Sequence, residues 1–178
     1  EGNMVDAYDD AAIENCLDTY QEHFEYRRQA FNDILECGNS LNFNITLDKI
    51  DRFTRSVLAH VESKYVGQKC GMDDEHTLAI DMRGNVLTCQ NVSALETSNN
   101  GESHFGGTLD EYKKVELKSS THWSNRKECP SCPVLHICKG ACMFLDKKFW
   151  DISCANAYSD NIVHFALAIR KMTGGYIP

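Results

Sequence analysis

The sequence predicts a small α+β fold, in which a β-hairpin and irregular cysteine-rich loops are flanked by amphipathic helices. Three observations support this class. Apolar residues recur at helical spacing near both ends of the chain, a short alternating stretch lies in the middle, and nine cysteines occur in 178 residues. The hydrophobic content of 42% excludes a wholly disordered chain, and the length fits about one domain with a helical appendage.

Two amphipathic helices are predicted at the start of the chain. Over residues 11–36, apolar side chains recur three, four and seven positions apart with acidic ones between them, and Gly38 suits the left-handed residue that ends many helices. A second helix is expected over 47–65, with Thr46 as its N-cap. Each helix has a single apolar face, so the two must pack against each other or against a neighbour.

A β-hairpin is predicted near the middle of the chain. Residues 78–82 alternate between apolar and polar or small side chains, the Arg-Gly-Asn sequence at 83–85 is a turn signal, and 86–88 form the return strand. Residues 97–107 are expected to form a flexible loop. A capping box then opens a short helix over 108–117.

The C-terminal part is predicted to be irregular between Cys129 and Cys154 and helical after that. Cys154 is expected at the N-terminus of the last helix, and Gly174 and Gly175 end it. The apolar face of this helix is formed by Tyr158, Ile162, Phe165, Ile169 and Met172. This face needs a partner surface elsewhere in the fold.

Charge is distributed unevenly along the chain. The formal net charge is −8, and residues 1–37 carry −8 by themselves, from ten acidic and two basic side chains. Residues 113–148, where cysteines are densest, carry +5 from eight basic and three acidic side chains. This pattern predicts either two differently solvated faces or cations around an anionic group. The acidic balance argues against nucleic acid as a partner.

The sequence predicts a cytoplasmic protein with no membrane partner. It has no run of about 18 apolar residues, and its start, EGNMVDAYDD, has neither the basic nor the apolar region of a signal peptide. An odd number of cysteines without an export signal argues against a disulfide framework. Bound metal is the usual alternative.

Seven of the nine cysteines form one spaced pattern. Cys16 and Cys37 lie outside it and are interpreted as small buried hydrophobic residues. The others follow the spacing C-x13-G-x4-C, then C-x2-C-x5-C-x3-C, then C: Cys70, Cys89, Cys129, Cys132, Cys138, Cys142 and Cys154. One tetrahedral ion uses four thiolates, so either two sites share the seven or one site leaves three idle. Gly140, between Cys138 and Cys142, allows a tight turn or a helix, and in both cases these two cysteines could serve different metals.

This pattern, with Gly84 and Gly140 included, resembles the SPASM domain. That domain is the C-terminal auxiliary iron–sulfur region of many radical SAM enzymes that modify ribosomally made peptides and proteins. The resemblance covers about residues 65–170. It implies that residues 1–66 are a helical lead-in from a radical SAM barrel, and that 67–178 are the auxiliary-cluster domain with its C-terminal helix.

The motif of the radical SAM core itself, C-x3-C-x2-C, is absent. Cys138 and Cys142 start this spacing, but Leu145 stands at the third position. By resemblance, the chain is expected to be an excised C-terminal piece that is inactive alone. S-adenosylmethionine would bind only in the missing barrel.

In this family the ligands of two 4Fe–4S clusters interleave along the chain. The resemblance implies a second auxiliary site closed by four thiolates: Cys129, Cys132, Cys138 and Cys154. It implies a first auxiliary site with three: Cys70, Cys89 and Cys142. The fourth ligand of the first site is left open, since His76 occupies the position where some relatives have cysteine. The other candidates are water, substrate, Asp73, Asp74 and Glu75, and an exposed His76 without a ligand role is the simpler interpretation.

By the same resemblance, the domain transfers electrons and positions a substrate peptide beside the barrel, with a reductant such as flavodoxin or ferredoxin as a further partner. No side chain is assigned as a nucleophile or general base. Four residues near the cysteines are interpreted as packing residues or as support for the ligands: His122, Trp123, His136 and Trp150. The alternative is a zinc-ribbon or rubredoxin-like structural module, in which the four cysteines of the second site hold one Zn or Fe ion. A single Fe or Zn ion in that site is also expected if the isolated chain is only partly loaded.

Overall fold

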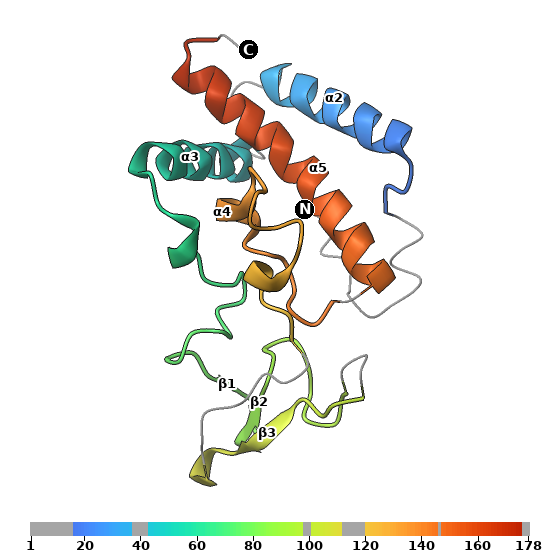
Figure 1. Cartoon of the computed structure of the whole chain (residues 1–178), viewed down its shortest axis with the longest axis vertical. Coiled ribbons are helices and arrows are strands. Elements are labelled where there is room, and N and C mark those ends of the chain that lie inside the picture. Colours follow the sequence, from blue (N-terminus) through green and yellow to red (C-terminus); the bar gives the residue numbers. More distant parts are fainter. Residues whose placement is uncertain (1–15, 37–42, 98–100, 112–119, 146, 176–178) are drawn as a thin grey trace.

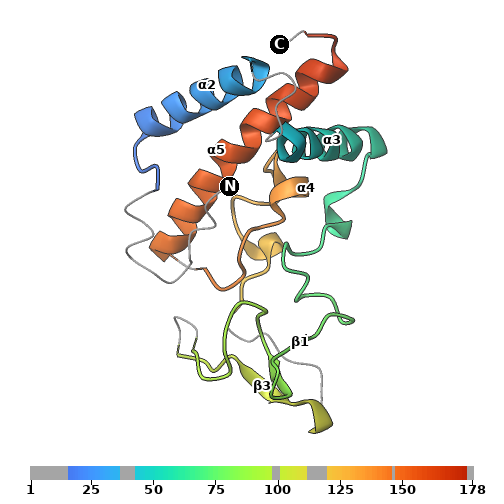
Figure 2. The same ribbon diagram turned by 180° about the vertical axis from the view of Figure 1, so that it is seen from behind.

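The computed structural model of the chain describes residues 16–36, 43–97, 101–111, 120–145 and 147–175. It contains helices and one small antiparallel sheet, which confirms the predicted α+β class. The three long helices gather at one end and the sheet lies at the other, with irregular segments between them (Figure 1). The view from behind shows the same separation (Figure 2). In the part of the chain that the structure describes, no helix combines the length and the apolar character that crossing a membrane requires.

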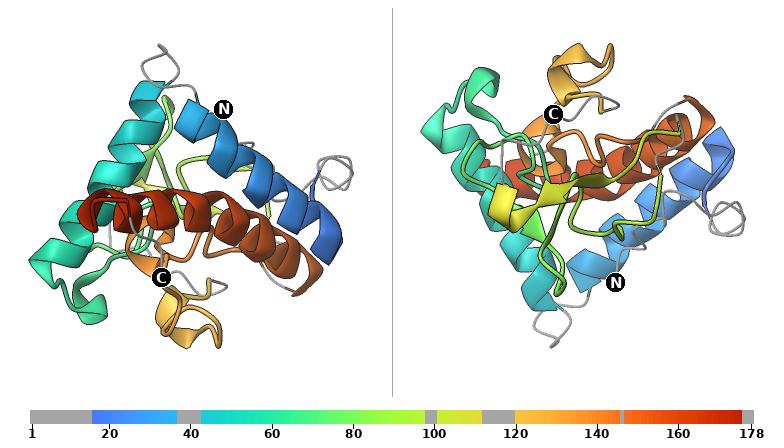
Figure 3. Two further views of the ribbon diagram at one scale, coloured as in Figure 1. Left: turned by 90° about the horizontal axis from the view of Figure 1, so that it is seen from above. Right: turned by 90° about the horizontal axis from the view of Figure 1, so that it is seen from below.

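The three long helices form a layer with an apolar core. Helices α2 (Tyr20–Glu36) and α3 (Phe43–Ala59) lie on either side of α5 (Lys147–Met172), and each packs against it (Figure 3). Phe53 is 1% exposed, and its ring meets that of Phe165 edge-on with 5.5 Å between the centroids. The buried core is formed by Ile50, Phe53, Val134, Val163, Leu167 and Ala168. The buried residues that α5 adds to this core are Val163, Leu167 and Ala168, which the predicted apolar face did not include. Of the predicted face, Tyr158, Ile162 and Phe165 pack partly buried against the core, whereas Met172 is exposed.

Helix α2 starts later than predicted. Residues 16–19 are not helical, so the predicted start at residue 11 is wrong. The helix begins at Tyr20 because Thr19 and Glu22 form a capping box. Oγ1 of Thr19 accepts from the amide of Glu22 at 3.2 Å, and Oε2 of Glu22 accepts from the amide of Thr19 at 2.8 Å.

Helix α3 is shifted toward the N-terminus relative to the predicted helix. It begins at Phe43, so Thr46 lies inside the helix and the prediction that Thr46 is the N-cap is wrong. It ends at Ala59, because His60 adopts a left-handed backbone conformation with φ of 48°. The apolar side chains that the prediction placed on the last turn therefore lie beyond the helix, and Tyr65 is exposed.

The predicted β-hairpin is confirmed. β1 (Ala79–Ile80) and β2 (Asn85–Leu87) pair antiparallel. Asp81 stabilises the turn, because its Oδ1 accepts from two turn amides at 2.8 and 2.9 Å. Gly84 has the left-handed φ, 80°, that this turn requires.

A third strand, β3 (Phe105–Thr108), pairs with β2 and gives the sheet order β1-β2-β3. The prediction of a loop over 97–107 is therefore wrong in its last part. The Phe-Gly-Gly-Thr sequence has no apolar alternation, and the strand forms through backbone pairing with β2 across an irregularity in register. Of the helix predicted over 108–117, the described part is a 3₁₀ turn at Leu109–Glu111, and the rest lies outside the described residues.

The cysteine-rich segment is largely irregular, as predicted. Between Cys129 and Cys154 the regular parts are the single-turn helix α4 (Leu135–Cys138) and the start of α5. A 3₁₀ turn at Trp123–Asn125 precedes this segment. Helix α5 begins at Lys147, about two turns before Cys154. The prediction that Cys154 stands at the N-terminus of this helix is wrong, so the helix dipole does not stabilise its thiolate. The predicted glycine end of α5 is confirmed by the left-handed φ of Gly174, 67°.

Candidate metal centre

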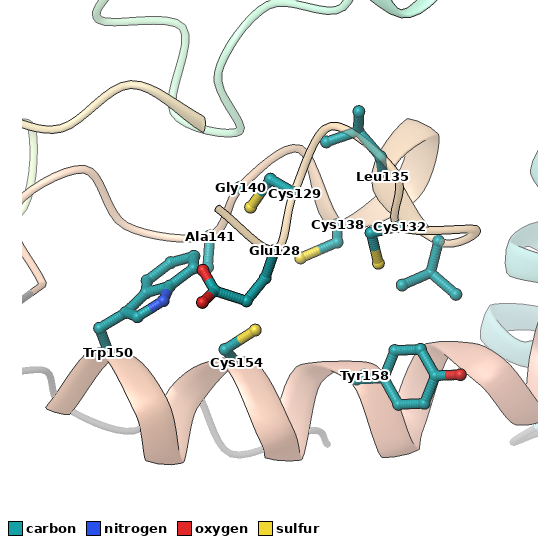
Figure 4. A pocket seen from close by; sticks show the side chains of 11 residues that line it. Glu128, Cys129, Cys132, Leu135, Cys138, Gly140, Ala141, Trp150, Cys154 and Tyr158 are labelled. Atoms are coloured by element: carbon teal, nitrogen blue, oxygen red, sulfur yellow. The ribbon is translucent and has the colours of Figure 1, made fainter. Parts of the chain in front are cut away.

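The four cysteines of the predicted second site line one cavity, and we call them the four-cysteine group. Cys129 and Cys132 come from the loop before α4, Cys138 ends α4, and Cys154 comes from α5. Their sulfurs lie in the space between the loop and the helix (Figure 4). The cavity has an empty volume of about 360 Å³, its open mouth included. Apart from one carboxylate the remaining lining is mainly apolar: Glu128, Val134, Leu135, Gly140, Ala141, Trp150 and Tyr158.

The thiols of this group are close enough to affect one another's ionisation. Burial raises the pKa of Cys129 to about 11, and the nearby thiols of Cys138 and Cys132 add to the shift. Burial also raises the pKa of Cys154 to about 12, with the other three thiols adding to it. Cysteine binds metal as the thiolate. Cys129 and Cys154 therefore stay protonated near neutral pH unless a cation in the cavity replaces their protons.

The three cysteines of the predicted first site, the three-cysteine group, also lie within electrostatic reach of one another. Burial raises the pKa of Cys70 and of Cys89, and the thiol of Cys142 raises both further. Backbone amides donate to two of the sulfurs: the amide of Met72 to Cys70, and that of Asn91 to Cys89 at 3.4 Å. Residues more than 70 positions apart in the sequence therefore contribute thiols to one place in the fold.

A left-handed turn separates the two groups. Lys139, Gly140 and Ala141 have φ values of 51°, 72° and 50°. The turn directs the amides of Gly140 and Ala141 to the sulfur of Cys138. Cys138 interacts with the four-cysteine group, whereas Cys142, four residues later, interacts with the three-cysteine group. The tight turn that the sequence left open as an alternative to a helix is the one observed.

The turn is held by a buried glutamine. Gln68 is 3% exposed, and its Nε2 donates to the carbonyls of Gly140 and Ala141, each at 3.1 Å. Its Oε1 accepts from the amide of Trp123, also at 3.1 Å. A Cβ atom at Gly140 would lie 2.3 Å from the Cβ of Trp123, so only glycine fits here. Gln68 thereby ties the segment that leads to Cys70 to this turn.

The candidates for the fourth ligand of the three-cysteine group are placed differently. The side chain of His76 is 84% exposed, and its Nε2 lies 3.5 Å from Oε1 of Glu75. Asp74 accepts from the amide of His76 through Oδ1 at 2.9 Å. Asp73 lies close enough to Cys70 to add to the rise in its pKa that burial causes. Ligation by His76 stays a prediction, and of these candidates Asp73 is the one placed near a thiol of the group.

The aromatic residues near the cysteines occupy packing positions. Trp123 and Trp150 are buried, and Nε1 of Trp123 donates to the carbonyl of Val66 at 2.8 Å. Trp150 also lines the cavity. Nε2 of His122 lies 3.3 Å from Oδ2 of Asp73, and the side chain of His136 is partly buried.

Sequence reasoning did not single out three residues beside the cysteines. Gln68 has no signal in the sequence, because its partners lie about 70 residues away. Glu128 lines the cavity, and Arg126 is buried close to thiols of both groups. The positive charge of residues 113–148 includes Arg126 but does not distinguish it from the other basic residues there. The structure does not describe the side chains of five lysines of that basic region: Lys113, Lys114, Lys118, Lys147 and Lys148.

Two cysteines, Cys16 and Cys37, lie outside the spaced pattern. Cys16 is partly buried, whereas the sequence predicted a buried residue. Burial raises the pKa of its thiol. Cys37 lies outside the described residues, as does Gly38 after it.

The spacing of the sulfurs bears on what the cavity could hold. Among the described residues, no three His, Cys, Asp or Glu side chains lie close enough together to bind one metal ion. A tetrahedral zinc ion needs thiolates about 2.3 Å from the metal, which brings the sulfurs within about 4 Å of one another. The four sulfurs line a shared cavity.

Comparisons with protein-family models, with curated proteins and with solved structures found no match for this chain. The resemblance described above therefore depends on the cysteine spacing and two glycines. The assignment of ligands to the two sites comes from the same resemblance.

Proposed function

We propose that this chain is an iron–sulfur-binding domain of the SPASM type, belonging to a radical SAM enzyme that modifies a ribosomally made peptide or protein. In this proposal the four-cysteine group holds one 4Fe–4S cluster and the three-cysteine group holds another. The division at residues 66 and 67, between a helical lead-in and the cluster domain, is part of the proposal.

One observation carries most of the argument: the seven cysteines separate into the same two groups that the interleaved ligand assignment requires. Cys138 and Cys142 are four residues apart and belong to different groups. A module with a single zinc ion would leave the thiols of the three-cysteine group without a metal. Two bound groups would use all seven thiols, whereas one tetrahedral ion would leave three idle.

The surroundings of the thiols suit anionic clusters. A cluster bound by thiolates carries net negative charge, and hydrogen bonds to its sulfurs tune its potential. Backbone amides already donate to the sulfurs of Cys70, Cys89 and Cys138. Since thiolate ligation needs reduced cysteines, the proposal includes a cytoplasmic location.

The expected roles are electron transfer and positioning of the substrate peptide. The three-cysteine group leaves one coordination position for Asp73, His76, water or substrate. The partners would be the radical SAM barrel of the same enzyme, the substrate peptide and a reductant such as flavodoxin or ferredoxin. S-adenosylmethionine would bind only in the barrel.

The second candidate is a zinc-ribbon or rubredoxin-like module with one Zn or Fe ion in the four-cysteine group. Four cysteines at one cavity favour it, because four thiolates complete a tetrahedral site. The second group of thiols counts against it, because one ion in the four-cysteine group would leave those thiols unused. In a partly loaded sample, a single Fe or Zn ion in the four-cysteine group is the expected form.

The test is anaerobic reconstitution with iron and sulfide, followed by a count of both. Two four-iron clusters predict about eight iron atoms and eight sulfides per chain, with a brown absorbance shoulder that dithionite bleaches. The matched control is Cys16→Ala, which leaves both groups intact and should leave the count unchanged. A colourless chain that binds one zinc ion per molecule would establish the second candidate instead.

A further inference from the structure

Arg126 is a buried cation held in a fixed position within the cysteine-rich region. It is 8% exposed, and its guanidinium carbon lies 3.6 Å from the centre of the Trp150 ring. Its Nη2 donates to the carbonyls of Leu145 at 2.7 Å and Met143 at 3.3 Å, with that of Cys142 at 3.5 Å. Stacking on one side and carbonyls on another leave the guanidinium little freedom to move.

Arg126 lies within electrostatic reach of thiols from both groups. When ionised, Cys129 and Cys154 of the four-cysteine group would act on it, as would Cys142 of the three-cysteine group. Glu128, which is exposed, also acts on it. A buried cation ordinarily requires a buried anion as its partner, and an arginine remains charged at any physiological pH. The hydrogen bonds of Arg126 described above go to neutral carbonyls, so apart from the exposed Glu128 the anions near it are those formed at the thiol groups.

One donor of Arg126 is unused. Within the described residues, its Nε is a buried side-chain nitrogen with no hydrogen-bond partner. An orphaned buried donor costs about 1–3 kcal/mol, so its persistence needs a reason. The Trp150 ring on which Arg126 stacks is itself part of the cavity wall. Arg126 reaches the cavity wall through this ring and is not itself one of the lining residues. A sulfur atom of a group bound in that cavity would be an acceptor of the kind that Nε lacks.

We propose that Arg126 donates from Nε to a sulfur of the group bound by the four-cysteine group, and that its charge stabilises the reduced state of that group. This inference rests on the proposed iron–sulfur function. On reduction the cluster gains one electron from a low-potential flavin or iron–sulfur donor, which loses one electron. No covalent bond changes and no proton moves. The cluster becomes more negative by one charge, and a nearby fixed cation makes this change more favourable.

The experiment measures the midpoint potential of the four-cysteine cluster by dye-mediated titration followed by electron paramagnetic resonance. All variants also carry Cys70→Ala and Cys89→Ala, which remove the cluster of the three-cysteine group. The paramagnetic signal then comes from the four-cysteine cluster alone. Arg126→Met removes both the charge and Nε–H at similar volume. It should lower the reduced-to-oxidised ratio at a fixed potential at least tenfold, equivalent to about 59 mV for one electron. Arg126→Lys keeps the charge without Nε–H and should give a smaller shift in the same direction.

The matched control is Lys127→Met, which removes an exposed charge one residue away, where solvent screens it, and should leave the potential unchanged. An Arg126→Met protein with a full cluster and an unmoved potential overturns the inference. If Arg126→Met does not fold, a potential for Arg126→Lys equal to that of the parent protein overturns it. A parent chain that takes up no iron and sulfide defeats the proposed function and this inference together. A loaded parent chain with unshifted variants defeats only the role of Arg126.

Discussion

The substitution Gly140→Ala tests whether the left-handed turn between Cys138 and Cys142 holds the two thiol groups together. It adds one methyl group at a residue with φ of 72°, and the new carbon would lie 2.3 Å from the Cβ of Trp123 and 3.0 Å from Nε2 of Gln68. The clash with Trp123 is with the base of a side chain whose backbone is also close, at 3.3 Å. The contact therefore cannot be relieved by a rotamer change alone.

Two costs can be estimated for this change. A left-handed backbone costs a residue with a Cβ about 1–2 kcal/mol, and forcing a methyl group into a packed site costs about 1–3 kcal/mol. The free energy of unfolding should therefore fall by about 2–5 kcal/mol. For a domain of this length each kcal/mol lowers Tm by about 2–4 °C, so the melting temperature should fall by roughly 4–20 °C. Because the turn aims two amides at Cys138, the iron content should fall as well.

Gly84→Ala is the matched control. Gly84 also has a left-handed φ, 80°, but no atom lies within 4 Å of a Cβ built there. This variant should carry only the backbone cost, about 1–2 kcal/mol, and retain its iron. The assay is thermal unfolding and iron content of the two variants, reconstituted side by side. If Gly140→Ala has the same melting temperature and the same iron content as Gly84→Ala, the packing of the turn against Trp123 does not matter and the reasoning is refuted.

Three further predictions concern the thiols. Cys154→Ala should remove about half of the bound iron. The C-terminal end of α5 should stay helical in hydrogen-exchange measurements, because the core around Val163 holds it. The control Cys16→Ala should keep all of its iron, and equal iron in both variants would contradict the assignment. Under graded chelation the three-cysteine group should lose iron first, since it has fewer assigned thiolates and joins distant segments, and simultaneous loss from both groups would count against this. In the metal-free protein, burial raises the pKa of Cys129 to about 11 and that of Cys154 to about 12, above the ordinary 9.0, so the folded state holds these protons more tightly. The free energy of unfolding of the metal-free protein should therefore be at its full value below pH 9 and fall between pH 9 and about 12. Urea titrations across this pH range measure it, and a free energy that does not change with pH would contradict the burial of these thiols.

Local patterns in the sequence predicted the parts of the fold that local interactions decide. The hairpin follows from alternation and a turn whose amides are bound by Asp81, four residues or fewer away. The end of α5 follows from its glycines. The division into two cysteine groups came from the resemblance to a known family, and in the fold the thiols within each group lie near enough to affect one another's pKa.

The sequence-based predictions fail where contacts with distant backbone or a strained local backbone determine the structure. β3 contains Phe-Gly-Gly-Thr, which has no strand pattern, and forms only because β2 lies alongside it. The end of α3 depends on the left-handed conformation of His60, a residue that carries no such signal. Arg126 and Gln68 were missed because their roles come from carbonyls that lie 16 to 73 residues away in the sequence. Such contacts become visible only once the chain is folded.

The placement of Cys154 in the middle of α5 has a consequence for affinity. Trp150, Cys154 and Tyr158 line the cavity, and Ile162, the next residue at the same spacing, packs against the helical core. Residues four apart form one ridge along a helix, so the core fixes the rotation of α5 and with it the direction of the Cys154 sulfur. Preorganisation of this kind places the entropic cost of orienting a ligand in folding rather than in binding. The helical layer thereby makes the cavity a stronger binding site without contributing a ligand from α2 or α3.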